Sequence, residues 1–527
     1  MVYFGAIARI EYDGWWHVFI SRVSDWPMFW REVYSNAHPP LFFLLLKFAS
    51  TCLGYSRLAY RAVSIVSGVF SVFLVGLIAA RVCRSRITVV LATLTFATST
   101  VTIVMANEVR SYMLAGACCL FSLYFFLDLV EPSSDRIRSR ILCGLGLTLG
   151  VLSHYVVFFV LPIVLVLPLV LVVLMPDYRK RFLGSWKKGL AAHLAMISVP
   201  IAVAAVEYLF HIRNITGSTL FSYLSAFRFE PGGQLSSYVW RVLSDELELF
   251  TPIDLHRATF LIQVLVVAAV ITGLAVLFGI LRKERQTGAA VFPIVAVMLV
   301  GGLLAASIIG RYPFGGTLRH QYIVFPMALV AFFLWFDRIA LRVSSRPGRA
   351  IFQGVFVAVL VVSGASQWSN LKTPRKELAT EGMERFRAEF GQASSIYLDQ
   401  FSLILFFAHE HDADWVSDPS FQQKRTDRFR VERDGRVFDV YRDRRWQAHL
   451  DRPAVFKSLH NTMSRANLDR MVVFHYERVR RGEPEGSLKL KEGAPRRLKK
   501  IASRNGLVLV GVVRHRNSVF AEFELEQ

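Results

Sequence analysis

Two acidic residues and a histidine occupy short polar segments that border apolar runs. Asp13 lies in an aromatic-rich segment near the start of the chain, Glu108 lies in a polar turn just before the apolar run 111–130, and His38 precedes a pair of prolines. Carboxylates suit general-base catalysis or coordination of a divalent cation. An imidazole that can carry charge suits a phosphate. These residue types therefore predict acid–base chemistry beside a phosphate group.

Each acid also has an ordinary structural explanation. Asp13 can be an exposed loop acid, and Glu108 can be a first-turn acid of a helix that Asn107 caps, where the helix dipole favours it. Arg110 can be an interfacial anchor whose stem lies in the apolar layer. For each residue taken singly, these alternatives stay open.

The two prolines at 39–40 predict that a helix begins beside His38 and runs to about Leu53, because amides in a first helical turn have no partner within the helix. The free amides at 41–42, together with His38, make this helix start a suitable seat for a phosphate. The alternative is a membrane helix whose histidine only caps it.

The composition predicts a polytopic membrane protein. Of 527 residues, 54% are hydrophobic and 13% aromatic, and the mean hydropathy is +0.40. Most apolar runs approach the roughly 20 residues that a helix needs to cross a bilayer, which predicts about 10–11 transmembrane helices. The runs lie at about 61–80, 87–105, 111–130, 141–153, 156–175, 189–209, 258–281, 290–309, 320–336 and 351–367.

One apolar run is interrupted at Ser153-His154-Tyr155. Irregular backbone is not tolerated facing lipid, so the break predicts a helical hairpin whose tip lines a polar cavity. A histidine at membrane depth is costly unless it faces such a cavity. His154 and Tyr155, with the segment Arg319-His320-Gln321-Tyr322, are therefore second-rank site candidates.

Lysine and arginine gather in alternate loops, which the positive-inside rule makes cytoplasmic. Much of the net charge of +21 is thus a topology signal and not a nucleic-acid-binding surface. The opposite loops, including the long loop 210–257, face outward. If residues 10–38 also face outward, a missing upstream segment is the expected explanation, unless Met1–Ile10 ends a first spanning helix. The basic loops lie at 81–86, 136–140, 179–188, 282–285 and 338–349.

The chain is predicted to divide into a transmembrane domain, 1–367, with a first outward segment at 10–60, and a soluble extracytoplasmic α/β domain, 368–527. The polar stretch 409–414 suggests a metal site, but contiguous residues rarely converge on one ion, so a solvated turn is favoured. The five cysteines all lie in or beside apolar runs. In the soluble domain, strands are expected near 395–398, 437–441, 471–474 and 507–513, and helices at 377–390 and 400–409.

The order of these motifs resembles bacterial polyprenyl-phosphate-dependent glycosyltransferases of the GT-C fold. Within this fold it resembles the Rgt-like group, beside protein O-mannosyltransferases and aminoarabinose transferases. The resemblance covers roughly residues 10–340. It rests mainly on His38-Pro39-Pro40-Leu41 and Glu108-Val109-Arg110-Ser111-Tyr112.

The resemblance implies a catalytic base in the first outward segment, where the family usually has Asp-Glu. Here Asp13 is followed by Gly14 and preceded by Glu11, so Asp13 is the expected base and Glu11 the fallback. Glu108 would position the acceptor, share a divalent cation with Asp13, or hold Arg110. The helix at 41–53 would lie along the outer face. Binding of the lipid phosphate or donor is expected from His38, Arg110, Tyr112, His154, Tyr155, Arg311 and Arg319.

The implied reaction is transfer of a sugar from a polyprenyl-phosphate carrier to a hydroxyl of an envelope glycan, lipid or protein, with inversion at the anomeric carbon. The expected partners are this donor, the acceptor and membrane lipids, and no nucleic acid. The site would face outward from the cell inner membrane. Two other classes stay open. A lipid-linked-sugar flippase or transporter would show paired, interrupted helices and ionisable groups near the midplane. A non-catalytic envelope scaffold would lose nothing when Asp13 is replaced.

Overall fold

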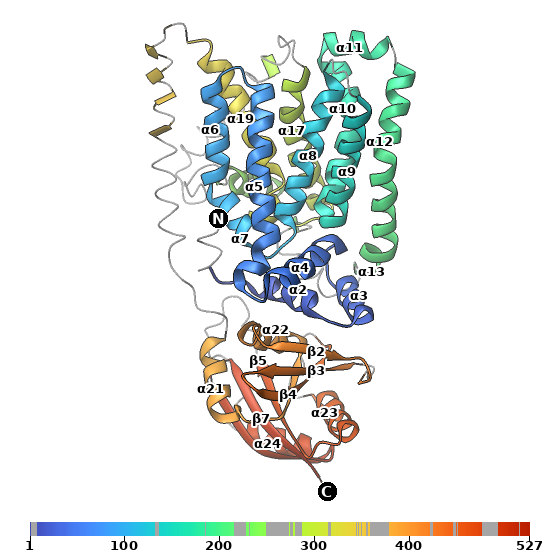
Figure 1. Cartoon of the computed structure of the whole chain (residues 1–527), viewed down its shortest axis with the longest axis vertical. Helices are drawn as coiled ribbons and strands as arrows, with labels where there is room; N and C mark the ends of the chain where they lie inside the picture. The colour runs from blue at the N-terminus through green and yellow to red at the C-terminus, as the bar shows by residue number, and fades with distance from the viewer. Residues whose placement is uncertain are drawn as a thin grey trace. The chain divides into compact units, whose positions relative to one another are not determined.

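A computed structural model shows a helical bundle and a mixed β-sheet (Figure 1). Contacts divide the chain into two compact units, each described here by itself. The membrane unit comprises Met1–Ala6, Tyr34–Leu45 and Arg61–Thr373; the second unit comprises Ile7–Val33, Leu46–Tyr60 and Pro374–Gln527. The structure describes residues 1, 8–131, 136–184, 186–215, 228–230, 232–248, 273–274, 278–279, 287–314, 318–343, 345, 347–348, 350–351, 353–354, 357–358, 379–421, 425–445, 450, 452–476, 494–515 and 517–526.

The membrane unit is helical. Six of its described helices are long and apolar enough to cross a membrane, or seven if the pair α6 and α7, bent by 47°, counts as one span. The polytopic class predicted from the composition is thereby confirmed. The helices of this part of the chain are α4 (Pro40–Leu53), α5 (Arg57–Val82), α6 (Arg86–Thr98), α7 (Thr100–Asn107), α8 (Tyr112–Val130), α9 (Arg136–Ser153), η1 (Tyr155–Phe159), α10 (Val160–Leu174), α11 (Pro176–Leu183), α12 (Trp186–Glu207), η2 (Tyr208–Ile212), α13 (Arg213–Ile215), α15 (Leu235–Glu248), α17 (Thr287–Ile308), α18 (Leu318–Gln321) and α19 (Val324–Ala340).

Two local predictions are confirmed by the helix boundaries. Helix α4 begins at Pro40, directly after the His-Pro pair, and the chain breaks between α9 and η1 at His154. The predicted spans 258–281 and 351–367 lie almost entirely outside the described residues.

Glycines allow close helix packing in the bundle. A Cβ atom on Gly144 of α9 would lie 2.8 Å from the carbonyl oxygen of Met196 on α12, and one on Gly116 of α8 would lie 2.7 Å from the Tyr322 ring. Small residues at such crossings let helices approach where lipid supplies no hydrophobic drive. They hold α8, α9 and α12 together around a core of aliphatic side chains.

The second unit contains a seven-stranded sheet of order β2-β3-β4-β1-β5-β7-β6. Strands β4, β1 and β5 run parallel and the outer strands pair antiparallel. The expected strands are β1, β4, β5 and β6, and the expected helices are α21 and α22; β2, β3, β7, α23 and α24 were not predicted. The elements are α2 (Tyr12–Arg22), α3 (Trp26–Ser35), α21 (Thr380–Phe390), β1 (Ser395–Asp399), α22 (Gln400–His409), β2 (Asp414–Asp418), β3 (Thr426–Arg433), β4 (Arg436–Asp443), α23 (Pro453–Ala466), β5 (Arg470–Tyr476), α24 (Ala494–Ser503), β6 (Leu507–His515) and β7 (Ser518–Leu525).

Candidate active site

Three predicted site residues converge in the membrane unit. The ring of His154 lies 4.4 Å from the Tyr112 ring and 5.0 Å from the His38 ring, centroid to centroid, and His38 lies 6.1 Å from Tyr112. Each residue is less than 10% exposed. They come from the segment before α4, the first residue of α8 and the break after α9. The interrupted helix and the His-Pro-Pro motif therefore meet at one place, which we call the imidazole cluster (His38, Tyr112, His154).

A backbone bond orients one ring of the imidazole cluster. The Nδ1 atom of His154 accepts a hydrogen bond from the amide of Val156 at 3.0 Å. In a neutral ring Nδ1 is then the acceptor, which places the proton on Nε2. The cluster thus offers imidazole N–H and phenol O–H groups in a buried setting, a donor set suited to phosphate oxygens.

Glu108 occupies a different helix end from the one predicted. Helix α7 continues to Asn107, so Glu108 is its C-cap, and α8 starts only at Tyr112 after the N-cap residue Ser111. The interpretation of Glu108 as a first-turn acid capped by Asn107 is therefore wrong, because Asn107 is the last residue of α7 and the next helix begins four residues after Glu108. A helix C-terminus disfavours a carboxylate. Arg110 offsets this, since its Nε lies 3.8 Å from Glu108 Oε2.

A buried arginine that the sequence analysis missed fixes this turn. Nε of Arg61 donates to the carbonyl oxygen of Asn107 at 2.7 Å, and the Ser64 hydroxyl donates to the carbonyl oxygen of Arg110 at 3.2 Å. Arg61 is 0% and Arg110 6% exposed. An arginine near the start of an apolar helix was the available signal, because intramembrane charge is expensive unless it has a role.

A second network anchors the segment before His38. The Tyr155 hydroxyl bonds to Nδ1 of His211 and lies 3.4 Å from a Glu207 carboxylate oxygen. Nε2 of His211 lies 2.7 Å from the carbonyl oxygen of Asn36, which can only accept, so Nε2 carries the proton and Nδ1 accepts from Tyr155. His211 lies in the π-helix η2, an irregularity frequent at functional sites. Sequence reasoning found Tyr155 but missed its partners.

The predicted arginines Arg311 and Arg319 lie on other elements. Arg311 is exposed in the turn after α17, and Arg319 is on the short helix α18. Burial, followed by the Arg311 guanidinium, lowers the pKa of Arg228. Arg228 belongs to the loop 210–257, of which 216–227, 231 and 249–257 lie outside the described residues.

Asp13 belongs to the second unit and is helical, not in a loop. It is half-buried in the first turn of α2, which packs against α22. The Tyr12 ring stacks on Phe401 at 4.5 Å, and Trp15 stacks on His411 at 4.9 Å. Because Asp13 and Glu108 are in different units, their approach and a shared cation remain predictions.

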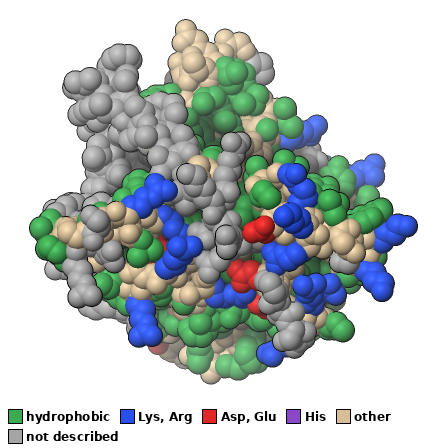
Figure 2. Space-filling model, turned by 90° about the horizontal axis from the view of Figure 1, so that it is seen from above, with side chains coloured by type: hydrophobic (Ala, Val, Ile, Leu, Met, Phe, Trp, Pro, Cys, Tyr) green, Lys and Arg blue, Asp and Glu red, His purple; other side chains and the backbone are tan. Residues whose placement is uncertain are grey.

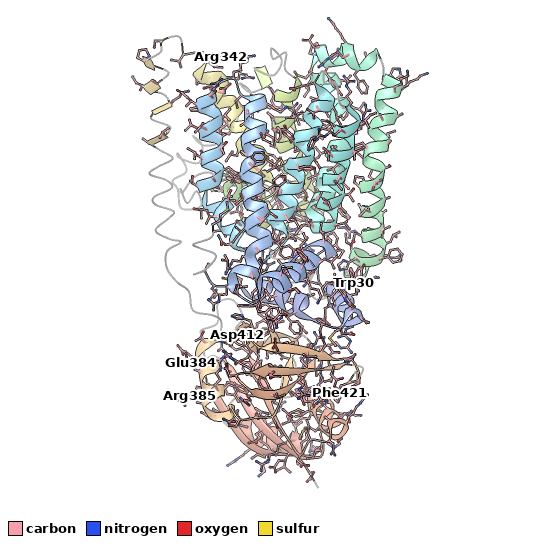
Figure 3. The ribbon with its side chains drawn as sticks, in the orientation of Figure 1. Trp30, Arg342, Glu384, Arg385, Asp412 and Phe421 are labelled. Carbon is pink, nitrogen blue, oxygen red and sulfur yellow. The ribbon has the colours of Figure 1, made fainter. Side chains whose placement is uncertain are left out.

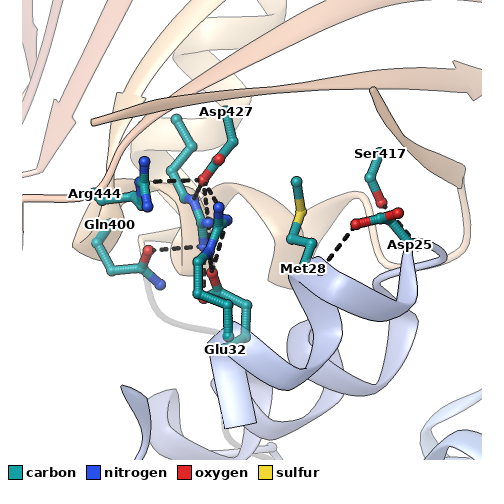
Figure 4. Close-up of polar contacts among 9 residues, drawn as sticks. Asp25, Met28, Glu32, Gln400, Ser417, Asp427 and Arg444 are labelled. Atoms are coloured by element: carbon teal, nitrogen blue, oxygen red, sulfur yellow. Dashed lines mark hydrogen bonds and ion pairs between the residues drawn. The ribbon is translucent and has the colours of Figure 1, made fainter. Parts of the chain in front are cut away.

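A buried ion-pair triad fixes α3 within the same unit (Figure 4). Nη1 and Nη2 of Arg442 donate to the Glu32 carboxylate at 2.8 and 2.7 Å, and Nε donates to Asp427 at 3.1 Å. Arg442 is 0% exposed and lies 5.6 Å from the ring centroids of both Phe19 and Phe429. The triad (Glu32, Asp427, Arg442) therefore joins α3 to strands β3 and β4.

Both acids of the triad are ionised at neutral pH. Burial alone would raise the pKa of Glu32, but the Arg442 guanidinium holds it below its ordinary value of 4.5. Burial likewise raises the pKa of Asp427, but Arg442 lowers it, and the net result is that the pKa of Asp427 is also below its ordinary value. Such a buried group is costly to disturb, because removing one partner leaves an uncompensated charge.

No group of three or more His, Cys, Asp or Glu side chains able to hold a metal occurs among the described residues. The stretch 409–414 forms a turn around Asp412, marked in Figure 3. Glu410 is 6% exposed and accepts from Arg387 at 2.7 Å and from Arg433. The interpretation of this stretch as a solvated turn is thus wrong for Glu410, because two arginines bind it.

Comparisons with known proteins agree with the architecture. Residues 37–203 match the family Dolichyl-phosphate-mannose-protein mannosyltransferase. The structure of ArnT from Cupriavidus metallidurans bound to undecaprenyl phosphate is similar, with a TM-score of 0.54, 12% identity, and coverage of 98% of this chain and 94% of that chain. Its apo state matches equally, at TM-score 0.54 and 13% identity over the same shares.

Archaeal oligosaccharyltransferase AglB from Archaeoglobus fulgidus, in complex with an inhibitory peptide and a dolichol-phosphate, aligns at TM-score 0.44 and 11% identity, over 89% of this chain and 66% of that one. None of the curated proteins matches the chain in sequence. The GT-C fold expected from the motifs is confirmed for this chain.

Proposed function

We propose that this GT-C chain transfers a sugar from a polyprenyl-phosphate carrier to an acceptor hydroxyl of an envelope glycan, lipid or protein. The observation that carries the proposal is the buried imidazole cluster. Its Tyr112 follows Arg110 by two residues in the chain. The ArnT structure with undecaprenyl phosphate has the same fold and supports a lipid-phosphate donor here. The active site faces outward from the inner membrane, as the basic loops favour.

The reaction needs one proton acceptor and stabilisation of one leaving anion. The acceptor oxygen attacks the anomeric carbon, its proton passes to the Asp13 carboxylate, and the bond from the anomeric carbon to the phosphate oxygen breaks. The electron pair of that bond leaves with the lipid phosphate. Attack opposite the phosphate inverts the anomeric centre. Preorganised donors aimed at the developing charge are the main electrostatic contribution to such a step.

His38, His154 and Arg110 are assigned to the leaving phosphate. All three are at least nine-tenths buried, so their hydrogen bonds act in a low dielectric where they are worth more than in water. Glu108 is assigned to holding Arg110, because the ion pair between them is present and Glu108 lies at a helix end that disfavours an isolated carboxylate.

The second unit is assigned to holding the base. Asp13 is on α2, and α2 is seated on α22 by the Tyr12–Phe401 and Trp15–His411 stacks. Arg22, at the end of α2, donates to the carbonyl oxygens of His411 and Ala413 at 2.9 Å each. Both ends of the helix that carries Asp13 are thus tied to the soluble domain.

The test is a transfer assay with purified protein and several radiolabelled polyprenyl-phosphate sugars. Wild type should release sugar from at least one donor, and Asp13→Asn should lose about 10²- to 10⁴-fold in kcat, the usual contribution of a general base. Glu11→Gln tests the fallback base and should keep activity.

Asp25→Asn is the matched control, an acid of the same segment that accepts a hydrogen bond from the Met28 amide at 2.8 Å. It should change kcat by less than about twofold. Equal losses in Asp13→Asn and Asp25→Asn would contradict the role of Asp13 as base. Lipid binding without sugar release from any donor would favour the flippase or the scaffold.

A further inference from the structure

A pocket of about 100 Å³ opens at the end of the membrane unit where arginines gather. Figure 2 shows this face, with Lys and Arg side chains clustered among hydrophobic ones and few acids. The pocket lies between the ends of α8, α9, α10 and α12 and the short helix α11. Its lining comprises Phe126, Leu129, Val130, Arg136, Arg140, Pro168, Tyr178, Arg181, Phe182, Gly189 and His193.

One wall of the pocket is cationic. Arg136 and Arg140 come from the first turns of α9, and Arg181 comes from α11, where its Nη2 donates to the Val130 carbonyl oxygen at 3.3 Å. Arg181 and Arg136 both lie within electrostatic range of the Tyr178 hydroxyl. Burial nevertheless raises the pKa of Tyr178 to about 12, so this hydroxyl stays protonated and can donate.

Two acids at the end of α8 are engaged by groups outside the pocket. Asp128 accepts from the Ser139 hydroxyl at 2.6 Å and pairs with Arg81 at 2.7 Å, and Glu131 pairs with Arg81 at 3.2 Å. None of the described lining residues is acidic. Three guanidinium groups therefore share one pocket without a carboxylate among its described walls.

The opposite wall is apolar and continuous with the membrane-spanning surface. Phe126 and Leu129 lie in the last turns of the span α8, and Pro168 lies inside the span α10. Trp186, at the start of α12, is 46% exposed. Exposed aromatic residues at span ends mark the headgroup level of a bilayer. A ligand here meets cations on one side and hydrocarbon on the other.

We propose that this pocket binds the phosphate of an anionic phospholipid, with its acyl chains along α8 and α10. Basic pockets between helix ends suit such headgroups, and the pocket volume is small enough to select one phosphate. The site is distinct from the imidazole cluster: Arg140 and His154 lie at opposite ends of α9, about 20 Å apart at 1.5 Å per residue. It does not depend on the proposed transferase activity.

The test uses delipidated full-length protein in neutral detergent and measures binding of phosphatidylglycerol by native mass spectrometry. The triple variant R136Q/R140Q/R181Q should weaken binding at least about tenfold, since each basic residue near a headgroup is worth roughly 1 kcal/mol. The charge-matched control R138Q/K180Q/K188Q removes three cations of the same helices that do not line the pocket. It should weaken binding less than about twofold.

A steric variant keeps every charge. A Cβ on Gly189 would lie 3.9 Å from the Phe182 ring, so Gly189→Leu fills the pocket without forcing backbone to move. Binding should fall about as far as in the triple variant, whereas Ala191→Leu, at an exposed position of the same helix, should leave it unchanged.

Equal losses in the pocket and control triples would overturn the proposal in favour of diffuse attraction by a basic face. So would unchanged binding in Gly189→Leu. Competition by inorganic phosphate at the same concentration as the lipid would also overturn it, since the pocket would then take a free anion. Phosphatidylcholine should bind at least about tenfold more weakly than phosphatidylglycerol.

Discussion

Arginine is used in two contrasting ways in the two units. In the second unit Arg442 is completely buried and bound by Glu32 and Asp427. At the basic end of the membrane unit, Arg136 and Arg140 line a pocket whose described walls contain no acid. The first arrangement is closed, because every charge has its partner inside the protein. The second is open, because the described walls of the pocket supply no carboxylate.

This contrast shows that the role of an arginine depends on whether its guanidinium is buried and paired with a carboxylate, and not on the number of arginines. A buried, matched guanidinium is part of the fold, and losing it exposes its partners' charges to a low dielectric. A partly exposed guanidinium in a pocket whose described walls hold no acid costs the fold little and is available for a ligand. Substitutions in the two places should therefore fail in different ways.

The largest effect is expected from Arg442→Met. It takes from two buried carboxylates the buried cation that both bind and leaves them only the partly exposed Arg31 and Arg444, so the loss should be about 3 kcal/mol of folding free energy, the lower end of the usual range. Thermal unfolding followed by hydrogen exchange in β3 and β4 should show this loss. Arg428→Met is the control: Arg428 is 33% exposed and pairs with Asp439 at 2.6 Å, so the loss should stay near 1 kcal/mol.

Removing the acids as well sharpens the test. The triple change E32Q/D427N/R442M leaves no uncompensated buried carboxylate, so it should be more stable than Arg442→Met alone. Equal losses of folding free energy for Arg442→Met and Arg428→Met would show that the triad stabilises the fold no more than a partly exposed ion pair does.

The next effect is a pH dependence of the second unit. Burial, and then the nearby Arg57, Arg22 and Arg433, lower the pKa of His411 from 6.5 to about 4, against the opposite effect of Asp412. Between these values the unfolded chain binds a proton that the folded chain does not, so stability falls as the pH drops from 6.5 to 4. After allowance for solvent screening, about 2 kcal/mol is expected.

His411→Phe keeps a ring on Trp15 and removes this titration. Melting temperatures measured across the interval should then be flat above about pH 4. The acids of the triad act in a separate interval: their folded pKa values are lowered, so their stabilisation is present above their ordinary values near 4 and is lost only below them. An unchanged slope in His411→Phe would refute the assignment to His411.

A smaller effect is expected from Glu108→Gln in the membrane unit. If Glu108 holds Arg110, the donor KM should rise about tenfold with kcat nearly unchanged, because only phosphate positioning is affected. Steady-state kinetics with the lipid-linked donor measure the split. A fall of 10²-fold or more in kcat would instead make Glu108 a catalytic acid or base.

The smallest effect is expected from Arg138→Gln at the basic end. Arg138 is exposed and does not line the pocket, so its loss should change stability by no more than about 0.5 kcal/mol. Thermal unfolding in detergent tests this directly. A loss of stability as large as that of Arg442→Met would show that exposed arginines at the basic end matter as much to the fold as the buried Arg442.

Local features were predictable because they depend on neighbours in the chain. The proline pair predicted the start of α4, the polar break predicted the interruption at His154, and alternating runs predicted strands β1 and β4. The end of α7 was not predicted, because the apolar run ends near residue 105 whereas α7 continues to Asn107, which makes Glu108 its C-cap. Strands β2 and β3 carry many charged residues, which hid their alternation.

By itself, the sequence determined the membrane class, the GT-C resemblance and the three residues of the imidazole cluster, since hydropathy and short motifs are local properties. Tertiary structure alone decided which residues meet. Glu32 and Arg442 are 410 positions apart, and Asn36 meets His211 across 175. No periodicity encodes such pairings, because they arise only when distant segments pack and each buried charge or polar group has to find its partner.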